Sequence, residues 1–86
     1  MAARKGWSGL TGWTRRPDEI VKEYRFRTFP AAVEFVRRVA DLAEAANHHP
    51  DILIRYNRVT LTLSTHDAGG LTGKDRALAV RIDRLV

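Results

Sequence analysis

The sequence predicts an α+β fold, in which a four-stranded antiparallel sheet carries two long helices on one face. Two periodic patterns predict it. Apolar residues recur at helical spacing over residues 29–47 and 72–85, and they alternate with polar residues over 20–27 and 52–63. A turn signal in the middle of the second alternating stretch indicates a hairpin, and therefore antiparallel strands. The expected order of elements is ββαββα.

The first two strands are predicted from short patterns. Residues 10–14 are interpreted as a short strand, and residues 15–18, which contain Pro17, as the turn that follows it. From Ile20 to Arg27 the residues alternate between an apolar and a polar set. Lys22 interrupts the apolar set, as a residue of an edge strand does.

The first helix has clear start and stop signals. Thr28 is a suitable N-cap, and Pro30 falls in the first turn, where a backbone N–H has no helical partner. Asn47 and Pro50 end the helix. The predicted buried stripe consists of Ala32, Phe35, Val36, Val39, Leu42, Ala43 and Ala46.

The second half of the chain predicts a hairpin and a helix. Ile52, Ile54 and Tyr56 alternate with polar residues, and residues 57–58 form a two-residue turn into the strand 59–63. Thr72 and Asp75 have the spacing of a capping-box variant at the start of the last helix. The apolar side of that helix is formed by Leu78, Ile82 and Leu85.

Composition limits the class of protein. The 86 residues indicate one domain, which we assign to residues 10–86, after an N-terminal arm at residues 1–9. The chain has no cysteine, so it can form no disulfide and offers no thiolate nucleophile or metal ligand. No stretch is apolar enough for a membrane span or a secretory signal, and a cytoplasmic location is therefore expected.

Residues 1–16 carry +4 of the net charge of +5. Arg4, Lys5, Arg15 and Arg16 all precede the first acidic residue, and the rest of the chain is nearly balanced. A solvated arm explains this distribution better than a surface that binds nucleic acid, which would concentrate basic side chains on a folded element. Nucleic acid and membrane are therefore not expected as partners.

All three histidines fall within one window, residues 47–75, and each lies beside a loop signal. Histidine both donates and accepts protons near neutral pH, so His48, His49 and His66 predict an acid–base site. The dipole of the preceding helix would favour a protonated imidazole at His48 or His49. Asp75 could fix the tautomer of His66, and Glu44 could lie on the same helix face as His48.

Plainer interpretations exist for each residue. A histidine after a helix is often a C-terminal cap, and Asp75 could only cap the last helix. Three histidines and a carboxylate could also bind zinc or iron, although adjacent histidines rarely ligate one ion.

The stretch ANHHPDILIRYNRVTLTLSTHDAGGLTGKDRALA resembles the pterin-4a-carbinolamine dehydratase family, and the resemblance extends from about Trp13 to Leu85. It implies a four-stranded antiparallel sheet with helices on one side, assembled into dimers or tetramers. It also implies a lyase that dehydrates 4a-hydroxytetrahydropterin to quinonoid dihydropterin, recycling the tetrahydrobiopterin of aromatic amino acid hydroxylases. Neither a metal nor an organic cofactor is implied.

The resemblance also assigns residues. It implies catalytic roles for His48, His49, His66 and Asp75, and contact with the pterin by Glu44, Asn47, Ser64, Thr65 and Asp67. From the residues alone, the histidine that acts as acid cannot be distinguished from the one that acts as base.

Two positions depart from the family pattern. Only eleven residues precede Gly12-Trp13, so the helix that family members carry there is shortened or absent, and Ile52 stands where an aromatic residue is common. Relatives of this fold also serve as a dimerisation cofactor of a transcription factor or as an assembly chaperone. A non-catalytic binding module is therefore the alternative function.

Overall fold

The computed structural model describes residues 10–65 and 69–86. Its elements follow in the order β1 (Thr14–Arg16), β2 (Glu19–Arg25), α1 (Phe29–Ala46), β3 (Asp51–Arg55), β4 (Arg58–Leu63) and α2 (Gly73–Asp83). The predicted order ββαββα and the α+β class are confirmed. The prediction that residues 1–9 form an arm lies outside the described residues.

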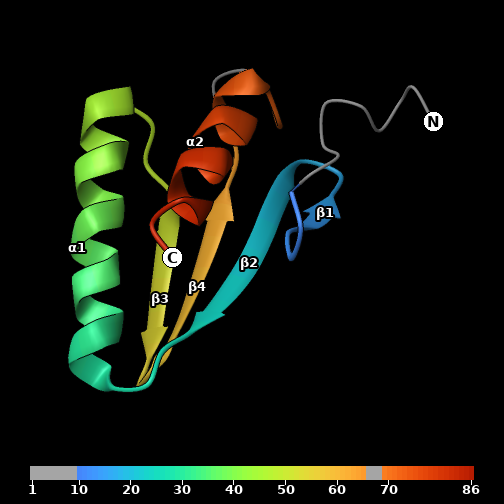
Figure 1. Ribbon diagram of the computed structural model, residues 1–86. Helices are drawn as coiled ribbons and strands as arrows, with labels where there is room; N and C mark the ends of the chain where they lie inside the picture. The colour runs from blue at the N-terminus through green and yellow to red at the C-terminus, as the bar shows by residue number, and fades with distance from the viewer. Residues whose placement is uncertain (1–9, 66–68) are drawn as a thin grey trace.

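The four strands form one antiparallel sheet in the order β1-β2-β4-β3, and both helices lie on the same side of it (Figure 1). Alternation along the strands sends one set of side chains toward the helices. The core between the layers is built from Ile20, Tyr24, Phe35, Val39, Val59, Leu61, Leu63, Leu78 and Ile82, with Leu10, Ala32 and Ala79. The other face of the sheet has no helix over it within the described residues, and we call it the open face.

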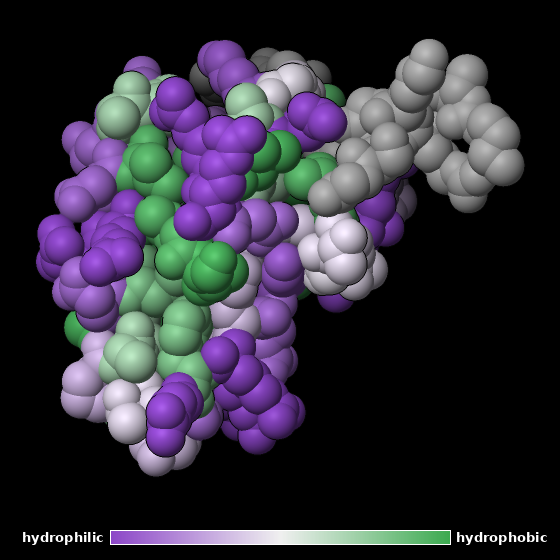
Figure 2. All heavy atoms as spheres, in the orientation of Figure 1, coloured by the Kyte–Doolittle hydropathy of each residue, from purple (hydrophilic) through white to green (hydrophobic). Residues whose placement is uncertain are grey.

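Helix α1 begins and ends as its sequence predicts. The Thr28 hydroxyl accepts a hydrogen bond from the Ala31 N–H at 3.2 Å, and Asn47 ends the helix with a left-handed backbone at φ 50°. The predicted stripe is buried at Ala32, Phe35, Val39 and Ala43. Figure 2 shows hydrophobic residues gathered over the middle of this side of the molecule, bordered by hydrophilic ones.

Lys22 corrects one sequence interpretation. Strand β2 is an inner strand, paired with β1 and β4, so Lys22 is not on an edge. Its ammonium group faces the helices and donates to Asp83 of α2 and to the Thr11 carbonyl, each at 2.9 Å. The same Asp83 carboxylate accepts from the Trp13 indole at 3.0 Å and from the Tyr24 hydroxyl. A polar residue in the apolar set is therefore explained by a tertiary partner.

The first strand also differs from the prediction. Residues 14–16 form β1, whereas residues 10–14 were expected to do so and residues 15–18 were expected to be the turn. Leu10 packs into the core from outside any strand, which accounts for the apolar signal there. No helix among the described residues is long and apolar enough to cross a membrane.

Candidate active site

The C-terminal end of α1 places the histidine pair. With Asn47 in the left-handed conformation, the His48 N–H bonds to the Ala43 carbonyl at 3.0 Å, and the Asn47 N–H bonds to the Glu44 carbonyl at 3.1 Å. These two bonds form a Schellman motif, which satisfies carbonyls that the helix end would leave without partners. The motif turns the chain so that His48 points inward, while His49 stays exposed.

Asp75 lies at the centre of the inward cluster. Its side chain is fully buried, and three groups surround its two oxygens. His48 Nε2 lies 2.6 Å from Oδ1, and the Thr65 hydroxyl donates to Oδ2 at 2.7 Å, as does the Thr72 N–H at 2.9 Å. If Asp75 is ionised, it accepts in all three contacts and His48 donates from Nε2.

The Thr72 N–H contact forms part of the helix N-cap. Thr72 and Asp75 make a capping box at the start of α2, as the sequence predicts. The Thr72 hydroxyl also lies 2.8 Å from the Thr65 hydroxyl. Asp75 therefore both caps α2 and holds His48, and sequence reasoning identified Thr72 only as a cap.

The third histidine, His66, follows the end of β4 in the sequence. Thr65 and Gly70, on either side of residues 66–69, exchange two backbone hydrogen bonds of 3.0 Å. The predicted roles of His66 and Asp67 lie outside the described residues. The proposed coupling of His66 to Asp75 is therefore untested, and among the described residues the histidine that contacts Asp75 is His48.

The second histidine of the pair has its own carboxylate. His49 Nε2 lies 2.6 Å from Glu44 Oε2, and both side chains are exposed, at 55% and 78%. The sequence suggested that Glu44 could share a face with His48, but the structure pairs it with His49 instead. The two neighbouring histidines thus occupy different environments, one buried against Asp75 and one in solvent against Glu44.

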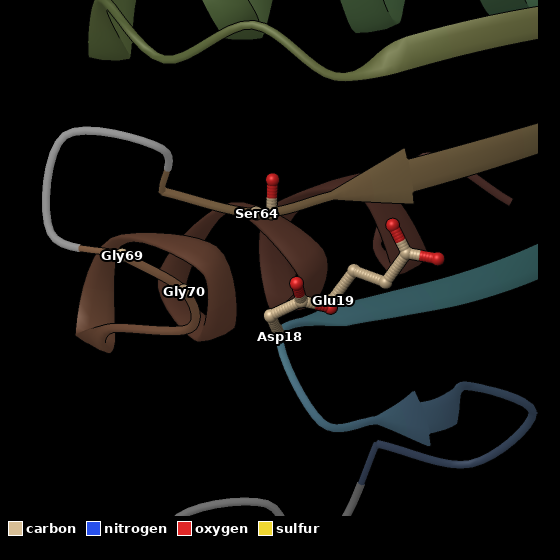
Figure 3. A pocket seen from close by; sticks show the side chains of 5 residues that line it. All are labelled: Asp18, Glu19, Ser64, Gly69 and Gly70. Carbon is tan, nitrogen blue, oxygen red and sulfur yellow. The ribbon is translucent and has the colours of Figure 1, made fainter.

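A pocket of about 200 Å³ adjoins the paired residues Thr65 and Gly70 (Figure 3). It is lined by Asp18, Glu19, Ser64, Gly69 and Gly70. Ser64 precedes the Thr65–Gly70 pair in the sequence, and Gly69 and Gly70 end the segment that begins with His66. Of its lining residues the sequence named Ser64. It gave no functional signal for Asp18, which was predicted only as part of the turn 15–18, or for Glu19, the first residue of β2.

These contacts unite residues far apart in the chain. Among residues 10–65 and 69–86, His48, Thr65 and Asp75 meet in one cluster, and Asn47 forms the cap beside it. No three metal-ligating side chains gather within this described part of the chain.

Comparison with known proteins identifies the class. The family model described as pterin 4 alpha carbinolamine dehydratase matches residues 2–85. A protein of Roseiflexus castenholzii, provisionally named pterin-4-alpha-carbinolamine dehydratase, is 62% identical over 77 residues, which cover 90% of this chain and 83% of the relative. A protein of Chloroflexus aggregans with the same provisional name is 56% identical over 86 residues, covering 100% of this chain and 86% of the relative.

Two solved structures of pterin dehydratase proteins have a fold similar to that of this chain. A transcriptional coactivator/pterin dehydratase from Brucella melitensis has a TM-score of 0.90 at 30% identity, covering 96% of this chain and 90% of that one. A pterin dehydratase-like protein identified as a RuBisCO assembly factor in the alpha-carboxysome has a TM-score of 0.70 at 27% identity, covering 85% and 84%. The family match, the relatives and the fold thus define a protein of the pterin dehydratase class. This chain belongs to the pterin 4 alpha carbinolamine dehydratase family.

Proposed function

We propose that the protein dehydrates a 4a-hydroxytetrahydropterin to the quinonoid dihydropterin by histidine acid–base catalysis. The observation that carries the proposal is the buried cluster of His48, Asp75 and Thr65, the last of which directly precedes His66 in the sequence. Family membership supplies the substrate class, and the physiological reaction partner we propose is an aromatic amino acid hydroxylase.

The reaction requires two proton transfers. The bond between C4a and the hydroxyl oxygen breaks, and the departing oxygen takes a proton and leaves as water. A base removes the proton of the ring N–H, and its electron pair forms the new C=N bond. Imidazoles on either side of the ring satisfy both requirements near neutral pH.

The two environments of the pair suggest different roles. His48 is about nine-tenths buried and its Nε2 is engaged by Asp75, so we propose that it holds one wall of the site and orients the substrate. His49 is exposed and its ring contacts only a solvated carboxylate among the described side chains, so it is available to exchange protons with a ligand. We propose His66 as the opposing group.

The remaining predicted residues would bind the pterin. Ser64 lines the pocket, and Thr65 has a hydroxyl fixed by Asp75, so both lie at the end of β4 where the substrate would reach His66. Glu44 and Asn47 lie at the end of α1 beside the histidines, and Asp67 completes the set from the loop. In this proposal Asp75 positions His48 rather than contacting substrate.

A direct dehydration assay tests the proposal. Wild-type protein should accelerate the loss of water from a 4a-hydroxytetrahydropterin, followed by absorbance. His49→Ala should lower the rate by about 10²–10⁴, the usual loss for removing a general acid or base. Arg38→Ala, a change at an exposed position of α1, the helix that precedes His49, is the control and should leave the rate unchanged.

Equal rates for wild type and for the uncatalysed reaction would contradict the proposal. Because the proposed steps are proton transfers by side chains, turnover should also persist after dialysis against a chelator. Loss of turnover with EDTA that zinc or iron restores would instead support a metal site, which the histidine-rich window also suggested.

The second candidate function is assembly of another protein. One relative of this fold is described as a RuBisCO assembly factor. This chain exposes large hydrophobic residues on one edge, which a partner protein could cover. Absence of dehydratase activity in a folded protein, together with turnover by a family member in the same assay, would favour this function.

We also propose that the protein forms homo-oligomers in the cytoplasm. Phe29 and Val33 of α1 are 50% and 42% exposed, and Ile52 and Ile54 of β3 are 38% and 37% exposed on the helix side of the sheet. We call these four residues the α1–β3 apolar surface. A second copy would bury them, which a domain of this size favours.

A further inference from the structure

Three arginines lie side by side across the open face of the sheet. The strand register places Arg25 of β2 opposite Arg58 of β4, and Arg58 opposite Arg55 of β3. The neighbouring residues Tyr24 and Val59 are buried toward the helices, so the arginines point to the opposite face, where all three are exposed. We call Arg25, Arg58 and Arg55 the arginine row. It crosses the end of the sheet where β3 turns into β4 (Figure 1).

The row is poorly neutralised. Arg25 has an ion pair with Glu23 at 3.6 Å, but within residues 10–65 and 69–86 no carboxylate pairs with Arg55 or Arg58. Like charges directly opposite one another weaken a sheet. The fold itself therefore gains nothing from two adjacent guanidinium groups here, and an anion between them would remove the repulsion.

The adjoining turn forms a pocket with the two free arginines. Arg55, Tyr56, Asn57 and Arg58 line an open space of about 400 Å³. Tyr56 is 70% exposed and has φ 56°, a left-handed conformation that a tyrosine adopts rarely. The Asn57 side chain donates to the Phe26 carbonyl at 2.8 Å, and this bond fixes the turn against the chain that leads into α1.

These features match one ligand chemistry. Guanidinium groups bind phosphate through paired N–H donors, and an exposed tyrosine ring stacks on a planar base. We propose that the pocket at the β3–β4 turn binds a nucleotide, with its phosphate between Arg55 and Arg58 and its base against Tyr56. The nucleotide could be free or part of a single-stranded RNA, since both present the same groups. The proposal is independent of the dehydratase function, because it uses the opposite end of the sheet from the histidine cluster (Figure 1).

Calorimetric titration of the folded protein with AMP, at low salt, tests the site. Wild type should bind AMP, and Arg55→Gln or Arg58→Gln should weaken binding at least about tenfold, because each removes a charged phosphate contact. Tyr56→Ala should weaken AMP binding but leave binding of inorganic phosphate unchanged. Arg81→Gln is the matched control, since it removes the same charge from an exposed position on α2 and should have no effect.

Thermal unfolding distinguishes a binding role of the arginines from a purely structural one. Arg58→Gln should leave the melting temperature unchanged or raise it, because the substitution relieves the repulsion. A ten-residue oligoribonucleotide that binds more tightly than AMP, and through the same two arginines, would support the site and identify RNA as its source. Failure of wild type to bind AMP and the oligoribonucleotide would overturn the proposal. Equal binding of AMP by wild type and by all the variants would also overturn the proposal. That result is expected if a carboxylate of a second copy already neutralises the arginine row.

Discussion

At the scale of single residues, Asp75 connects more segments of the site than the other residues described above. It is fully buried, yet its two oxygens contact a ring nitrogen, a hydroxyl and a backbone N–H. A buried carboxylate is tolerated only when its hydrogen-bonding capacity is filled, and here each donor comes from a different segment. The residue thus joins α1, β4 and α2 at one point.

Replacing Asp75 with asparagine separates its two roles. The amide can accept one hydrogen bond but brings N–H groups toward buried donors, so we expect a loss of about 1–3 kcal/mol in the free energy of unfolding. If the carboxylate also orients His48, turnover should fall by about 10- to 100-fold, less than the loss of a general acid or base. Urea denaturation and the dehydration assay measure the two effects. A stability loss with an intact rate would reduce Asp75 to a helix cap.

Tyr24 makes stability depend on alkaline pH. Burial raises the pKa of the Tyr24 hydroxyl far above its usual value of 10.0, and both the hydrogen bond to Asp83 and the negative charge of Asp83 add to this effect. The folded state therefore keeps a proton that the unfolded state releases above about pH 10, and the stabilisation present below that pH is lost as the pH rises. The loss should be at most about 1.4 kcal/mol per pH unit.

The measurement is the free energy of unfolding between pH 9 and pH 11, a window chosen around roughly the ordinary tyrosine pKa. Tyr24→Phe is the matched variant, since it keeps the ring and removes the proton. The variant should show a flatter dependence on pH than wild type. Parallel curves for the two proteins would contradict the assignment.

At the scale of elements, the end of α1 couples backbone geometry to the histidines. Asn47 has φ 50°, a conformation that asparagine tolerates and glycine adopts without strain. Asn47→Gly should therefore keep the free energy of unfolding within about 0.5 kcal/mol, whereas Asn47→Ala should lower it by about 1 kcal/mol. Thermal unfolding of both variants checks this difference.

The same pair of variants tests the predicted pterin contact. If the Asn47 side chain binds substrate, Asn47→Gly should raise KM although its fold is intact. An unchanged KM would leave Asn47 with its capping role alone.

The helices could be predicted from local signals, and features defined by tertiary partners could not. The hairpin was also predicted, but its turn lies at residues 56–57 and not at 57–58, so Arg58 belongs to β4. Helix α1 was predicted over 29–47 and found over 29–46, because Thr28 and Asn47 are caps whose side chains or backbone act locally. Strand β1 was misplaced, because its three residues are all exposed and carry no apolar pattern. Lys22 was misinterpreted, because its partner Asp83 lies 61 residues away in the chain.

In the candidate site, too, local features could be predicted from the sequence and tertiary contacts could not. The sequence identified the capping box and selected Asp75 as a partner of a histidine. It could not show that His48 is that partner among the described residues, since the contact spans 27 residues and depends on how α1 meets α2. Likewise, Glu44 lies five residues before His49 and one turn before His48, so spacing alone could not choose between them.

At the scale of the whole molecule, the exposed hydrophobic residues support the proposed homo-oligomer. The α1–β3 apolar surface lies at one edge of the molecule, on the edge strand β3, whose outer side has no neighbouring strand among the described residues. A single copy of this domain leaves that edge in water, and a second copy would cover both the side chains and the strand.

A charge placed on this surface should dissociate the oligomer. Val33→Asp puts a carboxylate where the proposed contact needs an apolar side chain, so sedimentation velocity should show a shift to monomer. Val86→Asp makes the same change at another exposed valine, outside the surface, and should leave the oligomer intact. A monomeric wild type, or an unchanged Val33→Asp oligomer, would contradict the proposed surface.

Because Asp75 both caps α2 and contacts His48, the motion of the helix end affects the histidine. Helix ends open more often than helix centres, and each opening of the first turn of α2 removes the cap contact from Thr72 to Asp75. Because the same carboxylate holds His48, the ring loses its anchor whenever that turn opens. In the proposed site, the fraction of molecules in which Asp75 holds His48 is then set by the local opening equilibrium of one helical turn. Slower amide exchange at Thr72 and Asp75 should accompany any ligand that occupies the site.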